Sequence, residues 1–309
     1  IETSDNAIFG NIKVNTGNNI VSFSSDVYIK RLYYRHGRIY AATNELKIDE
    51  IDYDFTNEAQ FDWNQNSSFQ GSERGVLSPN DMFIFDGNVS DGGLSLRIAG
   101  NGNYTFPIGI GTDATELLHN NSKYTPAEVT ISNFTDDGYI TITPVDAELQ
   151  TTDLSGGDIL SYYWNVDYDG FTTEPTVEYS FYYYESDLDG SGNEAIFVPG
   201  KVLDGNGYTR SYENDASQIS DESNTASIWN KIVFNDHDNG GNGFTLENAN
   251  YTAGEPNRFV GSPDIYYSRN AFFGAPGSCQ NGCDIDAQDG NPNTGCAGVT
   301  WDFWDNDWN

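Results

Sequence analysis

The chain has 309 residues and a formal net charge of −33 at pH 7, because 47 acidic side chains are opposed by only 14 basic ones. Such a polyanion is repelled by phosphate backbones, so no nucleic-acid partner is expected. No apolar run approaches the roughly 18 residues that a membrane-spanning helix needs, so no transmembrane segment is expected. The aromatic content of 14% argues against a disordered chain, since such chains are poor in aromatic residues.

Helical periodicity is nearly absent, and short runs of Val, Ile, Thr, Tyr and Phe end at Gly, Asn or Asp, which predicts an all-β fold. Residues 1–60 form the first segment, with apolar triplets about 7 to 11 residues apart, among them Ile12–Val14, Val27–Ile29 and Leu46–Ile48. This spacing suits either a β-meander or the rungs of a parallel, solenoid-like stack, and both remain open. A solenoid would make the segment one end of a stack, because a single rung cannot bury its own apolar face.

Residues 61–260 are expected to form an antiparallel β-sandwich core. Its longer strands are predicted at residues 82–85, 94–98, 104–106, 128–131, 139–143, 160–166 and 177–184, with shorter ones near 195–198, 228–234 and 244–247. One more short strand is predicted near 265–268, just after this range. Alternation of apolar and polar residues along 139–143 places one face inside and the other in water. Residues 261–309 are expected to be a loop-rich tail that contains the cysteines and several tryptophans.

Three cysteines, Cys279, Cys283 and Cys296, lie close together in this tail. A zinc site is disfavoured, because the nearest histidine in the sequence is His237. One local disulfide among the three is the favoured interpretation, and it fits an oxidising, extracellular setting. Which two cysteines pair is open, as is a partner for the third.

Several Asp-rich loops are candidate calcium sites. The best begins with Asp187, Asp189 and Ser191 at positions one, three and five, followed by a turn glycine, as in the first half of a calcium loop. Position twelve is Val198 instead of the bidentate Glu, so a solvated turn is the alternative. Two weaker loops start with the same Asp-x-Asp pattern. The candidate ligands are Asp187, Asp189, Ser191, Asn193, Glu194, Asp236, Asp238, Asn242, Asp284, Asp286 and Asp289.

Clustered aromatic residues suggest a second kind of site. Strand alternation would turn some of these rings outward, where Tyr and Trp stack on sugars or on a neighbouring subunit. The candidates are Trp164, Tyr183 and Tyr267. No nucleophile elbow, zinc-protease helix or phosphate loop is present in the sequence. Carboxylate pairs are uninformative among 47 acids, so no catalytic residue is assigned and no enzyme is expected.

Four short motifs carry a resemblance to a known group of proteins: Phe106–Gly109, Tyr124–Pro126, Gly138–Ile142 and Tyr162–Val166. Together they resemble a segment of large secreted cell-surface proteins of Bacteroidota, many of which use type IX secretion. The resemblance implies a β-sandwich flanked by solenoid-like segments, with an adhesive or filament role and no defined catalytic residues. It also implies that residues 251–254 are part of a link into a further solenoid.

The sequence therefore favours an extracellular, cell-surface, non-enzymatic structural or adhesive module of a filament or surface assembly, stabilised by Ca²⁺. Its partners would be other copies of itself or neighbouring modules. The alternative is a carbohydrate-binding module, or part of a glycan-active enzyme, that binds glycans through an aromatic strip.

Overall fold

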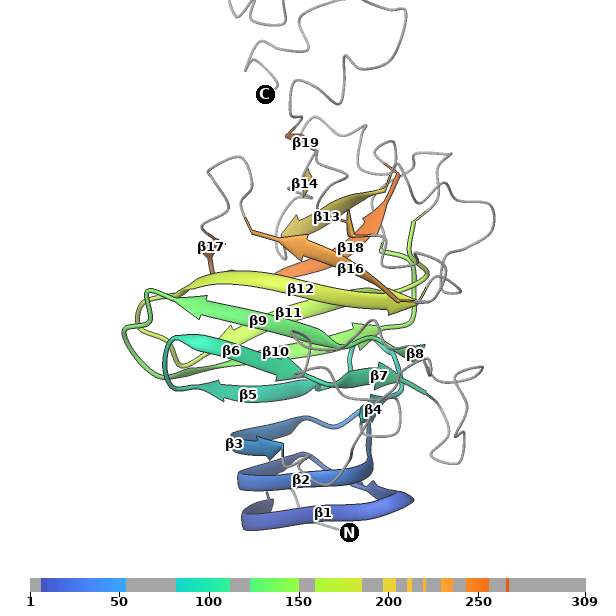
Figure 1. The fold of residues 1–309 in the computed structure, drawn as a ribbon, viewed down its shortest axis with the longest axis vertical. Helices are drawn as coiled ribbons and strands as arrows, with labels where there is room; N and C mark the ends of the chain where they lie inside the picture. The colour runs from blue at the N-terminus through green and yellow to red at the C-terminus, as the bar shows by residue number, and fades with distance from the viewer. Residues whose placement is uncertain are drawn as a thin grey trace, which may run out of the picture.

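The computed structural model describes residues 7–53, 82–111, 123–149, 159–184, 197–203, 210–212, 219–220, 229–235, 243–255 and 265–266. Within these ranges all regular structure is β-strand (Figure 1). The strands are β1 (Ala7–Ser22), β2 (Val27–Ala42), β3 (Leu46–Tyr53), β4 (Phe83–Phe85), β5 (Leu94–Ile98), β6 (Gly102–Phe106), β7 (Ile108–Ile110), β8 (Lys123–Tyr124), β9 (Ala127–Ser132), β10 (Gly138–Val145), β11 (Tyr163–Asp169), β12 (Thr176–Tyr184), β13 (Val198–Leu203), β14 (Arg210–Tyr212), β15 (Ile219–Ser220), β16 (Trp229–Phe234), β17 (Phe244–Thr245), β18 (Ala249–Gly254) and β19 (Ile265–Tyr266). The predicted all-β class is confirmed.

Two sheets pack face to face in the sandwich. The smaller sheet has the order β15-β16-β12-β9-β6, with β17 also on β12, and its pairings are antiparallel. The larger sheet contributes β10, β11 and β18, which also pair antiparallel. Between the sheets, the ring of Trp164 stacks on Phe181 at a centroid distance of 4.6 Å, and Phe181 contacts the ring of Tyr251 at 5.4 Å. Aromatic side chains packed in this way each bury a large apolar area.

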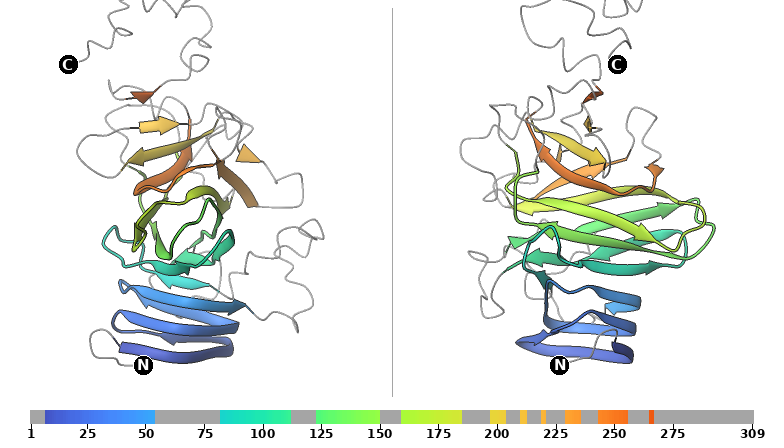
Figure 2. Two further views of the ribbon diagram at one scale, coloured as in Figure 1. Left: turned by 90° about the vertical axis from the view of Figure 1, so that its left-hand side faces the viewer. Right: turned by 180° about the vertical axis from the view of Figure 1, so that it is seen from behind.

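The N-terminal strands form a parallel stack, which decides between the two predicted arrangements. β1 pairs parallel with β2, and β2 pairs parallel with β3 through its first half and with β4 through its second half. Equivalent positions run from Ala7 to Val27 to Leu46, a repeat of about 20 residues. The segment is therefore a short solenoid-like ladder instead of a meander, and Figure 2 shows its rungs lying one above another.

Apolar columns hold the ladder together. Phe9, Ile29, Ile48 and Leu96 occupy equivalent positions on β1, β2, β3 and β5. Ile29, Ile48 and Leu96 are at most 3% exposed, so each rung buries its inner side chains against the next. This is the arrangement that lets rungs, which cannot bury their apolar face alone, share one continuous core.

The ladder merges into the sandwich without a break. β5 pairs parallel with β3 on one side and antiparallel with β10 on the other, and β7 pairs parallel with β4. The parallel pairing thus continues beyond residue 60, the boundary expected from the sequence, into strands that belong to the sandwich. The chain changes sheets at Pro107, which lies between β6 of the smaller sheet and β7 of the larger one.

Residues 251–254 lie in β18, which pairs with β11 and β13 inside the larger sheet. The expected link into a further solenoid stays a prediction, because the residues after 255 lie outside the described ones except for 265–266. The tail that was expected over residues 261–309 lies outside the described residues except for 265–266.

Candidate functional site

A polar cleft lies where the ladder meets the sandwich. β3 and β5 pair only from Leu46 to Ile48, and beyond that point the two strands separate. The space between them has a volume of about 670 Å³ and is lined by β3, β5 and β6, with Arg31 of β2 at one side. We call this space the junction cleft. Its volume falls within the range of about 300–1,000 Å³ that is usual for ligand pockets.

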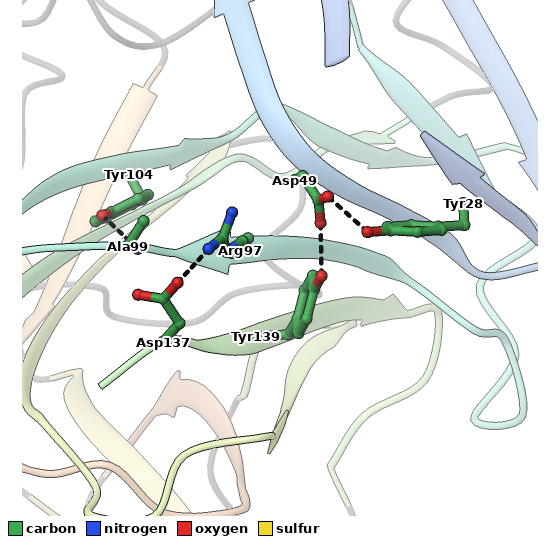
Figure 3. A network of polar contacts seen from close by, with 7 residues as sticks. All are labelled: Tyr28, Asp49, Arg97, Ala99, Tyr104, Asp137 and Tyr139. Carbon is green, nitrogen blue, oxygen red and sulfur yellow. Dashed lines mark hydrogen bonds and ion pairs between the residues drawn. The ribbon is translucent and has the colours of Figure 1, made fainter. Parts of the chain in front are cut away.

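Asp49 organises one wall of the junction cleft (Figure 3). The hydroxyl of Tyr28 donates a 2.5 Å hydrogen bond to its Oδ2, and the hydroxyl of Tyr139 donates a 2.5 Å hydrogen bond to its Oδ1. The pKa of Tyr28 is raised, chiefly by the hydrogen bond to Asp49. Burial is the main reason that the pKa of Tyr139 is raised, and Asp49 adds to it. Both phenols therefore remain protonated donors, and the carboxylate is held by strands on two sides.

The basic side chains near Asp49 are also paired with acidic or aromatic side chains. Arg97 of β5 donates to the carboxylate of Asp137, which raises the pKa of the guanidinium. Lys47 lies 3.9 Å from the ring centroid of Tyr139 and donates a 2.9 Å hydrogen bond to Asp169. The wall is thus an interlocked set of charged and aromatic side chains, with each charge close to an opposite one.

The β6 side of the junction cleft is fixed by two tyrosines. The hydroxyl of Tyr53 donates a 2.9 Å hydrogen bond to the backbone oxygen of Thr105, so its side chain bridges β3 and β6. Tyr104 accepts from the Ala99 amide at 3.2 Å and donates to the Gly100 oxygen at 3.0 Å. Both hydroxyls are occupied by the protein, which restrains the two rings.

A second feature is the outer edge of β1. Among the described residues β1 pairs only with β2, although it is 16 residues long. Of its inward apolar side chains, Val14 is 2% exposed, whereas Phe9, Ile12 and Val21 are only partly buried. The residues in register with them on β2 are Ile29, Leu32 and Ile39, which are 1%, 0% and 0% exposed. The difference arises because no described strand covers the outer side of β1.

The predicted aromatic ligand site is corrected. Trp164 and Tyr183 are both 0% exposed, so neither ring can stack on a sugar from solvent. The alternation argument failed because both faces are buried at these points of β11 in the larger sheet and β12 in the smaller one, where Tyr163 and Tyr182 are buried as well. Trp164 points into the main core, while its neighbour Tyr163 packs in a second apolar cluster with Val198 and others. Tyr267, the third candidate, lies outside the described residues.

The predicted calcium ligands and cysteines also lie outside the described residues. This holds for Asp187, Asp189, Ser191, Asn193, Glu194, Asp236, Asp238, Asn242, Asp284, Asp286 and Asp289, and for Cys279, Cys283 and Cys296. In the part of the chain that is described, no group of three or more His, Cys, Asp and Glu side chains is arranged to hold a metal ion. Over the same residues, no helix is long and apolar enough to cross a membrane.

Sequence reasoning missed the junction cleft because its residues are scattered. Asp49, Arg97 and Tyr139 are up to 90 residues apart and belong to no motif. The one signal in the sequence was the polar pair Asp49 and Glu50 between the apolar residues Ile48 and Ile51.

Comparison with protein-family models, curated proteins and solved structures finds no match for this chain. The assignment of function therefore rests on the geometry of the chain itself.

Proposed function

We propose that this chain is a non-enzymatic structural or adhesive module of an extracellular surface assembly, and that β1 is where a neighbouring module or a second copy adds a strand. The single observation that carries the proposal is the edge of β1, which no strand among the described residues covers, although the rungs beside it pair in parallel. A long unpaired strand edge is a template for pairing with another chain.

The apolar columns support strand addition at this edge. Phe9, Ile12 and Val21 continue columns that are fully buried one rung further in. A strand added outside β1 would bury these side chains as β1 buries those of β2, at about 25 cal/mol for each Å² of apolar surface removed from water. In solenoid proteins an end of this kind requires a capping repeat or a partner.

The charge of −33 makes such an assembly dependent on salt. Two copies repel each other at low ionic strength, and screening at about 0.15 M salt limits the repulsion to roughly 8 Å. Bound Ca²⁺ would reduce the charge further, and the Asp-rich loops around Asp187, Asp236 and Asp284 are the proposed sites. An extracellular location fits this dependence, and the resemblance to secreted surface proteins points the same way.

Sedimentation velocity of the whole chain over a range of concentrations and salt tests the proposal. We expect reversible self-association that strengthens with salt. Ile12→Lys places a charge in an apolar column and should abolish it, whereas the matched control Ile8→Lys should not, because Ile8 is already 64% exposed. Circular dichroism of each variant checks that the fold is retained. A wild-type chain that stays monomeric under all these conditions contradicts the proposal, as does an Ile12→Lys variant that associates like the wild type.

A further inference from the structure

We propose that the junction cleft binds a neutral oligosaccharide, with the ring of Tyr104 as its stacking platform. The site is separate from the outer edge of β1, because the cleft is lined by β3, β5, β6 and Arg31 of β2, and no residue of β1 lines it. Binding in the cleft and assembly through β1 can therefore succeed or fail independently.

The shape of the cleft suits an extended, narrow ligand. Its long sides are strand β3 and the β5–β6 segment, and the hydrogen bond from Tyr53 to Thr105 joins β3 to β6 across it. Among the described residues β6 pairs only with β9, so the other edge of β6 is left for the cleft. The ligand would therefore meet backbone polar groups of β6 as well as side chains.

Tyr104 gives the cleft a rigid aromatic surface. Its hydroxyl donates to Gly100 and accepts from Ala99, so the ring is fixed before any ligand arrives. An aromatic ring that is already ordered loses little conformational entropy on binding. The C–H face of a pyranose ring can pack on such a surface while its hydroxyl groups remain free for hydrogen bonds.

The polar lining matches hydroxyl groups better than it matches an ion. Each sugar hydroxyl donates one hydrogen bond and accepts others, and the cleft offers carboxylate acceptors at Glu50 and Asp52 and donors at Arg31 and Asn103. The amide oxygen of Asn103 accepts from Thr130 at 3.0 Å, which orients the amide group.

The charges of the lining are close to balanced. Three carboxylates, those of Asp49, Glu50 and Asp52, stand with the two guanidinium groups of Arg31 and Arg97. Arg31 lies 3.4 Å from Glu50, and Arg97 pairs with Asp137. An anion would meet the three carboxylates and the repulsion of the whole chain, and both arginines are already paired with carboxylates. A neutral ligand avoids this repulsion.

Isothermal titration calorimetry with defined neutral hexasaccharides tests the proposal, using cello-, xylo-, manno- and malto-hexaose in the presence of chelator. We expect saturable binding of at least one of these probes by the wild-type chain. The double variant Asp52→Ala/Asn103→Ala should weaken that binding at least tenfold, and Tyr104→Ala should weaken it at least as much, because it removes the ring on which the sugar packs. Lys30→Ala is the matched control for an exposed residue outside the cleft and should leave the affinity unchanged.

The proposal is overturned if none of the four probes binds, or if the double variant binds as well as the wild type. It is also overturned if a lysine-rich peptide binds at the cleft and the sugars do not. Sedimentation of the same variants distinguishes a failure of sugar binding from a failure of the proposed assembly. The cleft substitutions should leave self-association intact.

Discussion

The hydroxyl of Tyr139 donates a 2.5 Å hydrogen bond to the carboxylate of Asp49, and this contact clamps the sandwich to the ladder. Tyr139 lies on β10 and Asp49 on β3, and β5 separates the two strands in the sheet. Tyr28 of β2 binds the other oxygen of the same carboxylate. One side chain thereby fixes the relative positions of strands from the antiparallel and the parallel part of the fold.

Removal of one hydroxyl from this clamp should weaken the fold measurably. Tyr139→Phe leaves the ring in place but takes a hydrogen bond from the Asp49 carboxylate, so we expect a loss of about 1–2 kcal/mol in the free energy of unfolding. Urea denaturation measures the loss. Tyr33→Phe serves as the control, since within the described residues its hydroxyl makes no hydrogen bond, and it should change the free energy by less than about 0.5 kcal/mol.

Stability should fall at alkaline pH. Burial raises the pKa of Tyr53, Tyr179 and Tyr251 above the ordinary value of 10.0, and Tyr139 is raised as well. Above about pH 10 the unfolded chain loses these phenolic protons while the folded chain keeps them, so the unfolded state binds fewer protons and unfolding becomes easier. The stability that these groups contribute is complete below pH 10 and is lost as the pH rises through the folded pKa values.

Ultraviolet absorbance of tyrosinate, recorded together with circular dichroism during a pH titration, checks this expectation. A fraction of the 20 tyrosines should ionise only when the strand signal is lost. Ionisation of all tyrosines near pH 10 with the fold intact would be incompatible with the buried hydroxyls described above.

Two glycines of the ladder should respond differently to the same substitution. A Cβ atom at Gly92 would lie 2.3 Å from the backbone nitrogen of Glu45, so Gly92→Ala must push two rungs apart and should cost about 1–3 kcal/mol. At Gly10 of β1 nothing lies within 4 Å of the added atom, and Gly10→Ala should be neutral or stabilise by about 0.5–1 kcal/mol. Thermal unfolding of the two variants gives the comparison, and equal losses would contradict the described packing of the rungs.

Truncation of the buried tryptophan should act on the fold alone. Trp164 stacks on Phe181, and its indole nitrogen donates a 2.9 Å hydrogen bond to the Thr125 backbone oxygen, so Trp164→Ala should cost about 3–5 kcal/mol. Denaturation in urea measures this cost. Any sugar binding should persist under conditions where the variant is still folded, and a selective loss of sugar binding by the folded variant would restore Trp164 as a ligand residue.

Calcium should stabilise the chain if the Asp-rich loops bind it. A ligand that binds only the native state adds about 2.7 kcal/mol to the free energy of unfolding when its free concentration is one hundred times its dissociation constant. We expect a higher melting temperature in millimolar Ca²⁺ than in chelator at matched ionic strength, with part of the gain lost in Asp187→Ala/Asp189→Ala. An unchanged melting temperature would contradict calcium binding by these loops. The acidic surface would then serve solubility alone.

Much of the sandwich could be predicted from the sequence because its strands alternate in a regular way. Residues 94–98 and 139–143 were expected as strands and lie in β5 and β10. Among the strands that were missed, β7 and β18 are poor in bulky β-branched residues or contain glycine, as in Ile108–Ile110 and Ala249–Gly254. Their pairing is imposed by neighbouring strands and leaves little trace in their own composition.

The parallel pairing of the ladder strands and the presence of the junction cleft could not be predicted, for a different reason. An apolar triplet such as Val27–Ile29 has the same pattern in a hairpin and in a solenoid rung, and only long-range pairing with Leu46–Ile48 distinguishes them. The clamp joins Asp49 to Tyr139 across 90 residues, a distance at which sequence patterns carry no contact information.

The central claim, that assembly adds a strand to β1, is tested most directly by hydrogen exchange with mass spectrometry on the monomeric and the assembled chain. We expect that assembly slows amide exchange in residues 7–22, while exchange in β9 and β12 stays the same, because those strands already pair on both sides. Unchanged exchange across residues 7–22, or new protection confined to other strands, would contradict it.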